Sequence, residues 1–274
     1  RGQPDFPAGQ SAAYMPSPSS DPPNVLQSSH PLILHKITQM RKARAGPFSP
    51  SALALRAIAP PPRVQAKAGP KYLNQLLREV STFLCYEATA DLEMEPCAVT
   101  SRLGEEKGQR LANRVAIVPV MRGGLGMLEA MTEMVCNARV YHLGIYRDKK
   151  SLMPVEYYNK LPKRVTVQTA FVLDPCPLSG ATAIAAIDIL KAWGSTADFK
   201  LRIKFVCIGA SQQAVDNISS AHPDVPIHVG LIDRLHDPDG APLAPILPGL
   251  GDIGDRLFGT DGNDDFDEDG LDGA

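Results

Sequence analysis

The chain has 274 residues, 44% of them hydrophobic and 21% charged, an ordinary composition for a globular protein with one sizeable core. Its formal net charge is −2, and because residues 261–274 hold seven acidic side chains and no Lys or Arg, the remainder is mildly basic. The sequence lacks the patch of basic and aromatic residues that is typical of nucleic-acid-binding proteins. It also has no apolar run that approaches the roughly 20 residues of a transmembrane helix.

The two ends of the chain differ in composition from the middle. Residues 1–29, rich in Pro, Ser, Ala and Gly, predict a disordered leader or transit-peptide remnant, which favours a plastid location with the cytoplasm as alternative. Residues 261–274 predict an acidic disordered tail. Between them, residues 30–260 are expected to form one domain interrupted by an Ala/Pro-rich inserted arm at 43–70. The five cysteines form no C-x-x-C pair, which is typical of a reducing compartment.

In chain order, helical and strand patterns alternate. A short helix begins after His30, a long helix spans residues 72–90, and an irregular charged stretch follows to Arg114. Apolar runs predict strands at 115–120, 138–147, 170–173, 201–208 and 227–232, with helices at 127–136, 183–193 and 212–221. Residues 149–164 are expected to form a hairpin or flap. This alternation predicts an α/β fold, a mostly parallel twisted sheet flanked by helices.

The stretch 170–193 carries the clearest chemistry. A buried strand ends on Asp174, small residues follow at 179–182, and a helix then starts. Unpaired N–H groups at a helix N-terminus and the helix dipole favour an anion, so a phosphate is the expected ligand. Gly and Ser could equally serve only to turn the chain, since no Lys completes a Walker pattern. Asp174, which would repel phosphate, indicates contacts with sugar hydroxyls or a metal.

Three strand ends carry a charged side chain, namely Arg122, Arg147 and Asp174. In mostly parallel sheets the ligand lies beyond the carboxyl ends of the strands. Each Arg alone is more often a surface residue. Together, two guanidiniums and a carboxylate at one edge would suit a diphosphate and a sugar.

Residues 246–260 contain a literal G-x-G-x-x-G, formed by Gly249, Gly251 and Gly254. A dinucleotide fingerprint requires a preceding strand, a following helix and an early place in a βαβ unit, whereas this motif follows prolines close to the acidic tail. We therefore interpret it as a loop that offers backbone groups to a flat ligand such as a nucleobase.

Taken together, these motifs resemble the uracil phosphoribosyltransferase family. The resemblance runs from about His30 to Thr260 and is carried by HPLILHKIT, YEATADLE, VPVMRGGLGM, IYRDKKSLMPVEYYNKLP, LDPCPLSGAT, HPDV and PGLGDIGDRLFGT. It implies a type I phosphoribosyltransferase-like fold with a small flap or hood. It also implies transfer of a phosphoribosyl group from phosphoribosyl diphosphate to uracil, with Mg²⁺ carried by the diphosphate rather than by protein side chains, and at least a homodimer.

The resemblance also assigns the site. Arg122 and Arg147 would contact the diphosphate, and Asp252 would lie close to the ribosyl donor. The 5′-phosphate and ribose would be enclosed by Asp174, Pro175, Cys176, Pro177, Leu178, Ser179, Gly180, Ala181 and Thr182. Uracil would be recognised mainly by the backbone of Ile246 and of residues Gly251, Asp252 and Ile253.

Several positions depart from the family pattern. The phosphate loop DPCPLSGAT stands where the family reads like DPMLATGGS, so that Pro177 removes a donor and Ala181 replaces a glycine. Pro245 stands where a Tyr is usual, and Ile253 where a small residue is. The alternative function is thus a catalytically weak or silent relative that serves a binding or assembly role. Regulation by a nucleotide such as GTP, and a related base as substrate, stay open.

Overall fold

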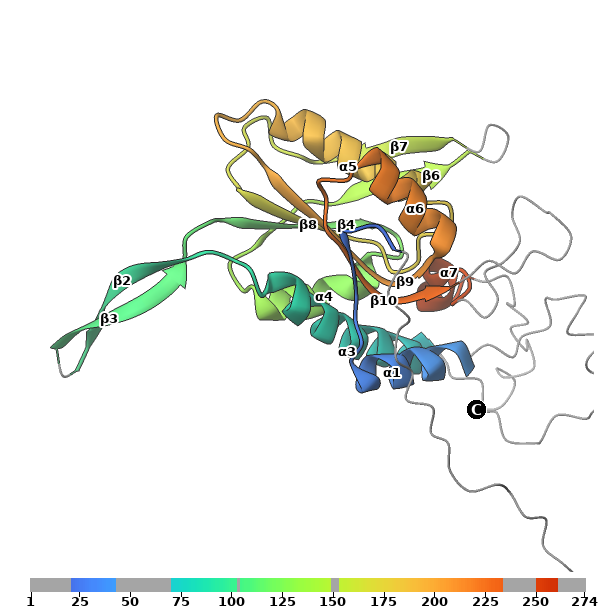
Figure 1. Cartoon of the computed structure of the whole chain (residues 1–274), viewed down its shortest axis with the longest axis horizontal. Helices are drawn as coiled ribbons and strands as arrows, with labels where there is room; N and C mark the ends of the chain where they lie inside the picture. The colour runs from blue at the N-terminus through green and yellow to red at the C-terminus, as the bar shows by residue number, and fades with distance from the viewer. Residues whose placement is uncertain (1–20, 43–69, 103, 149–152, 234–249, 261–274) are drawn as a thin grey trace, which may run out of the picture.

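A mostly parallel sheet with helices on both faces forms the body of the protein (Figure 1). The computed structural model describes residues 21–42, 70–102, 104–148, 153–233 and 250–260. The strand order is β1-β10-β9-β8-β4-β6-β7, with β5 beside β4, and only β6 and β7 pair antiparallel in this sheet. The predicted fold class is confirmed.

The elements have the following bounds. The strands of the sheet are β1 (Val25–Gln27), β4 (Val115–Met121), β5 (Arg139–Val140), β6 (Leu143–Arg147), β7 (Pro154–Asn159), β8 (Thr169–Leu173), β9 (Arg202–Ser211) and β10 (Ile227–Asp233). The helices are α1 (Pro31–Lys42), α3 (Pro70–Thr89), α4 (Leu125–Met134), α5 (Ala181–Gly194), α6 (Gln212–Ala221) and α7 (Ile253–Phe258). A separate hairpin consists of β2 (Met94–Ser101) and β3 (Gly104–Leu111).

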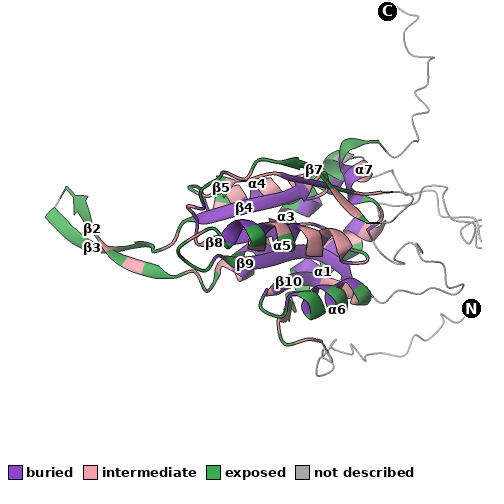
Figure 2. Cartoon of the chain, turned by 90° about the horizontal axis from the view of Figure 1, so that it is seen from above, coloured by how far each residue is buried: buried purple, intermediate pink, exposed green. Residues whose placement is uncertain are grey.

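The central strands are apolar on both faces because each face is covered by helices. In β8, Ala170 and Val172 belong to the cluster that α5 and α6 cover, whereas Phe171 and Leu173 belong to the cluster that α1, α3, α4 and α7 cover. Alternate residues of a strand point to opposite faces, so a continuous apolar run is what such a strand requires. Figure 2 shows these strands as the most deeply buried part of the molecule.

The parallel register sets the position of the functional turns. Val115 to Pro119 of β4 pair in register with Thr169 to Leu173 of β8. β4 continues for two residues beyond this pairing, and the turns that follow the two parallel strands, at Arg122 and at Asp174, lie at the same edge of the sheet. The sequence-based prediction of a shared edge is confirmed for these two turns.

A β-hairpin forms the predicted flap. β6 and β7 pair antiparallel, with a register shift between Gly144 and Ile145. The predicted strand at 138–147 is wrong in one respect, because it is interrupted after Val140 and forms two strands, β5 and β6.

Other expectations were also wrong. The stretch to Arg114, expected to be irregular, contains the hairpin β2–β3, which extends from the body and is exposed along most of its length (Figures 1 and 2). Since this hairpin buries neither face, it has no apolar alternation in its sequence to predict it. Residues 25–27, expected to belong to a disordered leader, form β1 and pair with β10. Residues 253–258, interpreted as loop, form the short helix α7.

Several predicted segments lie outside the described residues. These are residues 1–20 of the leader, the arm at 43–69, part of the flap at 149–152, the base-reading Ile246 and the acidic tail at 261–274. Among the helices that the structure describes, none has the length and apolar character needed to cross a membrane.

Gly124, in the turn after β4, provides a test of this packing. A Cβ at this position would lie 2.3 Å from the carbonyl oxygen of Leu173 and 2.7 Å from that of Val120, both backbone atoms of central strands. We expect Gly124→Ala to lower the free energy of unfolding by at least about 2 kcal/mol in urea denaturation, because the backbone must shift. Gly209→Ala is the control, since its Cβ would have no neighbour nearer than 3.6 Å. Equal midpoints for the two variants would contradict this packing.

Candidate active site

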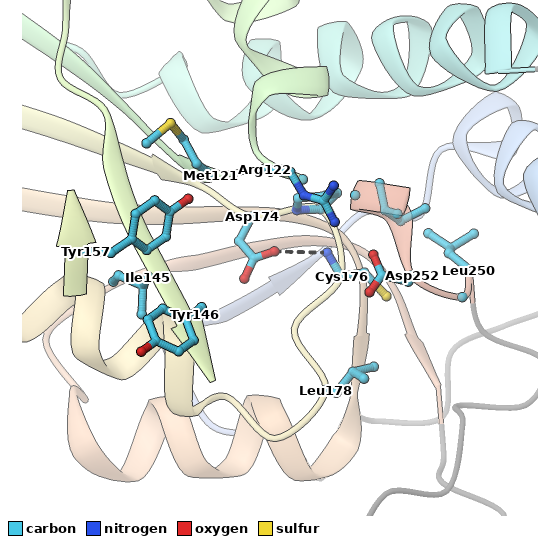
Figure 3. Close-up of a pocket in the computed structure, with 15 residues that line it drawn as sticks. Met121, Arg122, Ile145, Tyr146, Tyr157, Asp174, Cys176, Leu178, Leu250 and Asp252 are labelled. Atoms are coloured by element: carbon cyan, nitrogen blue, oxygen red, sulfur yellow. Dashed lines mark hydrogen bonds between the residues drawn. The ribbon is translucent and has the colours of Figure 1, made fainter. Parts of the chain in front are cut away.

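A cavity of about 790 Å³ opens at the carboxyl edge of the sheet (Figure 3). Four segments line it, namely the turn after β4, the hairpin β6–β7, the loop after β8 and the segment before and within α7. The lining residues are Met121, Arg122, Gly123, Ile145, Tyr146, Tyr157, Asp174, Pro175, Cys176, Leu178, Leu250, Gly251, Asp252, Ile253 and Gly254. Residues more than 130 positions apart thus line the same cavity, as the predicted site requires.

A smaller hollow of about 240 Å³ adjoins this cavity. The two share Met121, Gly123, Asp174, Cys176 and Leu178. The smaller hollow adds Val120, Arg147, Pro177, Gly180, Thr182 and Ala183, which surround the N-terminus of α5. Asp174 therefore lies between a large hollow and a small one that is suited to an anion.

The loop after β8 is fixed to the sheet by its carbonyl groups. The oxygen of Pro175 accepts hydrogen bonds from the N–H groups of Ile208 and Gly209, both at 3.1 Å, and that of Pro177 accepts one from Ser211 at 3.3 Å. These three bonds fix the loop on β9. Pro177 lies in the wall of the smaller hollow.

Helix α5 begins at this loop with the conformation expected of an anion site. Gly180 is its N-cap with a left-handed backbone (φ +78°) and has no side chain to cap the helix, although the hydroxyl oxygen of Ser179 accepts a hydrogen bond from the Ala181 N–H at 3.4 Å. The first N–H groups of an α-helix have no partner within the helix, and the helix dipole makes this end electropositive. Ala181 is the first residue of α5, so it needs no left-handed conformation. The replacement of a family glycine by Ala181 is compatible with the loop.

Arg147, at the end of β6, lies against this loop. Its guanidinium donates a hydrogen bond to the hydroxyl oxygen of Ser179. Because Arg147 also lines the smaller hollow, its charge is directed towards the helix N-terminus. Arg147 and the loop thus form one cationic pocket, although they come from segments 32 residues apart.

Asp174 is a carboxyl group in an unfavourable environment. Desolvation raises its pKa to about 6, and a single backbone N–H, that of Cys176 at 3.4 Å, opposes this effect. A carboxylate with so few donors readily accepts hydrogen bonds from a ligand, and sugar hydroxyl groups are suitable donors.

Arg122 is paired within the protein. Its guanidinium donates to Asp255 Oδ1 at 2.5 Å and to Thr260 Oγ1 at 3.0 Å. The Thr260 hydroxyl also donates to Asp255 at 2.7 Å, and this bond, with the Arg122 guanidinium, lowers the pKa of the Asp255 carboxyl. The turn after β4 is therefore attached to the C-terminal segment, and an anionic ligand would have to compete with Asp255 for Arg122.

The segment Leu250 to Ile253 forms the wall of the cavity that lies opposite the hairpin β6–β7 (Figure 3). Gly251 has a left-handed backbone (φ +70°), and Asp252 is the N-cap of α7, its Oδ1 accepting a hydrogen bond from Asp255 N–H at 3.0 Å. Leu250 and Ile253 are buried beneath this turn. Gly251 and Asp252, which lie between them, line the cavity.

The structure thus brings most of the predicted site together. Arg122, Asp174, Asp252 and Gly251 line the larger cavity, and Arg147 lines the adjoining hollow. Ile246 lies outside the described residues. Among the described residues, no three His, Cys, Asp or Glu side chains lie together in a way that could hold a metal ion.

The sequence did not single out several lining residues. Tyr146 and Tyr157 line the cavity from the flap, their rings tilted at 52° with centroids 6.0 Å apart. Asp255 and Thr260 were missed as partners of Arg122. The signal for Tyr157 was its place in the predicted flap at 149–164, and that for Tyr146 was its place near the end of the predicted strand at 138–147. No local pattern indicates a partner 133 residues away.

The comparisons with known proteins agree with this geometry. The sequence model of the family described as uracil phosphoribosyltransferase matches residues 52–260. A uracil phosphoribosyltransferase of Roseiflexus sp. is 42% identical over 236 residues, covering 86% of this chain and 98% of its own. One from Dictyoglomus thermophilum is 39% identical over 238 residues, covering 86% and 99%.

A solved structure shares the fold of this chain. The AQ2163 protein from Aquifex aeolicus is 29% identical and superposes with a TM-score of 0.68, covering 85% of this chain and 97% of that one. The similarity therefore includes the arrangement of the sheet and its helices as well as the motifs. On these grounds, the chain belongs to the uracil phosphoribosyltransferase family.

Proposed function

We propose that this protein transfers the phosphoribosyl group of phosphoribosyl diphosphate to uracil, forming UMP and diphosphate. One observation carries the proposal: Arg122, Asp174 and Asp252 line a single cavity that adjoins the hollow at the N-terminus of α5, which Arg147 lines. The two hollows match a ligand with an anion at one end and a planar base at the other. Family membership supports the same reaction.

Each part of the donor has a fitting part of the cavity. The 5′-phosphate fits the helix N-terminus, where backbone N–H groups and Arg147 supply positive charge. The ribose hydroxyls would donate to Asp174, whose carboxylate has one protein donor in the structure described here. The sequence-based expectation placed both arginines at the diphosphate. Because Arg147 bonds Ser179, we now assign Arg147 to the 5′-phosphate, and Arg122 is then the main guanidinium for the diphosphate.

The leaving diphosphate requires cations. Mg²⁺ keeps several waters and is commonly held by substrate phosphates with one or two carboxylates, so the acidic side chains that line the cavity, Asp174 and Asp252, fit an ion carried by the diphosphate. When bound, it would neutralise charge on the leaving group. Arg122 would add a second positive charge once it leaves Asp255.

Uracil fits the wall opposite the flap. Backbone N–H and C=O groups at Gly251 and Asp252 can match the alternating donors and acceptors of a pyrimidine edge. Ile253 adds an apolar surface beneath them. The chain's contribution is therefore mainly to position two reactants and to exclude water, which alone can remove about 7–11 kcal/mol from a barrier.

A steady-state assay tests the reaction. Purified full-length chain with uracil, phosphoribosyl diphosphate and Mg²⁺ should form UMP, and Arg147→Ala should lower kcat/KM for the donor by about 100-fold or more. Arg139→Ala is the matched control, because Arg139 is exposed and lines neither hollow. If the folded wild-type chain neither forms UMP nor binds the donor in calorimetry, the result would instead support the alternative function, a catalytically silent relative with a binding or assembly role.

We expect the Asp174 side chain to lower the free energy of unfolding near neutral pH, although the reaction needs it. A carboxyl whose pKa is raised from about 3.9 in the unfolded chain to about 6 binds protons more readily when folded, so its contribution to stability falls as pH rises through that window. We expect Asp174→Asn to increase the free energy of unfolding at pH 7.5 by about 1 to 3 kcal/mol. The gain should shrink towards pH 4, and donor turnover should be lost. A less stable variant at pH 7.5 in urea titrations would contradict this account.

We also propose that the chain works as a homodimer or larger assembly. On the hairpin β2–β3, Met94 and Leu111 lie directly opposite each other and are 53% and 40% exposed. An isolated two-stranded hairpin is marginally stable in water, so a surface that covers these side chains would stabilise it. Light scattering should give at least twice the 29.5 kDa of one chain, falling towards one chain when both residues are replaced by Lys. A wild-type monomer would refute the proposal.

A further inference from the structure

The guanidinium of Arg256, on α7, contacts two segments that are distant in sequence. It donates one hydrogen bond to the backbone oxygen of Leu250 and another to that of Met40, the latter at 3.1 Å. The backbone N–H of Arg256 donates to the oxygen of Asp252 at 3.0 Å. Arg256 lines neither hollow, yet both Leu250 and Asp252 line the larger cavity.

Met40, whose carbonyl is one of the two acceptors of Arg256, belongs to a rigid part of the core. It lies in the last turn of α1, where carbonyl groups have no partner within the helix and the dipole favours a cation. Its side chain is fully buried, with Ile33 and Ile37, against the sheet. Arg41, the next residue, pairs with both carboxylate oxygens of Asp233 at the end of β10. Through Arg256, the Leu250 carbonyl is therefore connected to a rigid part of the core.

The segment that Arg256 holds depends on tertiary contacts, of which the pair between Arg122 and Asp255 is another. Helix α7 has only six residues, which is too short to be stable without tertiary contacts. The turn also contains Gly251, and glycine is the residue type with the greatest backbone freedom. Packing of Leu250 and Ile253 buries apolar area but does not fix the direction of the peptide groups, whereas a hydrogen bond to a carbonyl does. Arg256 therefore fixes the direction of the Leu250 carbonyl, which directly precedes Gly251 and Asp252 in the chain.

We propose that Arg256 is a positioning residue for the base end of the active site. It holds the Leu250 carbonyl against α1, so that the backbone from Gly251 to Ile253 presents one fixed set of donors and acceptors to the pyrimidine. The inference rests on the proposed function and adds a determinant of base affinity that does not touch the substrate. A displacement of about 1 Å at such a site can cost roughly 100-fold in rate.

The test compares Arg256→Gln and Arg256→Lys in the full-length chain. The Gln variant should raise KM for uracil by about 10-fold or more, with KM for phosphoribosyl diphosphate changed by less than about 2-fold, because the phosphate loop is anchored independently on β9. The Lys variant should recover part of the uracil affinity, since an ammonium can still bind one of the two carbonyls. Arg78→Gln is the control, because Arg78 pairs with Glu129 and Glu133 on the surface of α3 and α4.

Three outcomes decide the question. A selective rise in KM for uracil, with the Lys variant intermediate, supports the proposal. Unchanged kinetics, or equal losses in both KM values together with a lower melting temperature, would overturn it and leave Arg256 a structural residue. Should the wild type form no UMP, the proposed function fails. In that case, calorimetry with UMP tests the positioning role. Equal binding of UMP by the wild type and by Arg256→Gln, or no binding by either, would overturn the proposal.

Discussion

The in-register parallel pairing of β4 with β8 is the constraint on which the site depends. It brings the carboxyl ends of both strands to the same side of the sheet, so the turn that carries Arg122 and the loop that begins with Asp174 meet at one edge. Apolar residues on both faces hold this pairing in the core, and Gly124 allows the turn to pass within contact distance of the two strands. A change of one residue in register would shift the turn that carries Arg122 relative to Asp174 and would exchange the residues that each strand presents to the two covered faces.

Around this edge, polar groups are held in arrangements that suit a ligand better than the protein alone. Asp174 has a raised pKa and accepts one backbone hydrogen bond from the described residues, the N-cap of α5 is a glycine without a side chain, and Arg122 is paired with Asp255. Each arrangement lowers stability or must be exchanged when a substrate binds. Such local conflict within a well-packed core is typical of active sites.

Much of the fold and part of the site could be predicted from sequence. The runs VAIVPV and AFVL, each followed by a small-residue turn and a helix, give the parallel sheet and place Arg122 and Asp174. The hairpin at 94–111 could not be predicted, because it is exposed on both faces and has no apolar alternation. The contacts of Arg147 with Ser179, Arg122 with Asp255 and Arg256 with Met40 join distant segments, and they depend on packing that a single sequence does not display.

The central claim is that one cavity holds a phosphorylated pentose beside a planar pyrimidine. An electron-density map of crystals grown with UMP tests it most directly. The account predicts the phosphate at the N-terminus of α5 near Arg147, the ribose hydroxyls within hydrogen-bonding distance of Asp174, and the base against the backbone of Gly251 to Ile253. UMP bound at another surface, or bound with its base at the α5 N-terminus, would contradict the account.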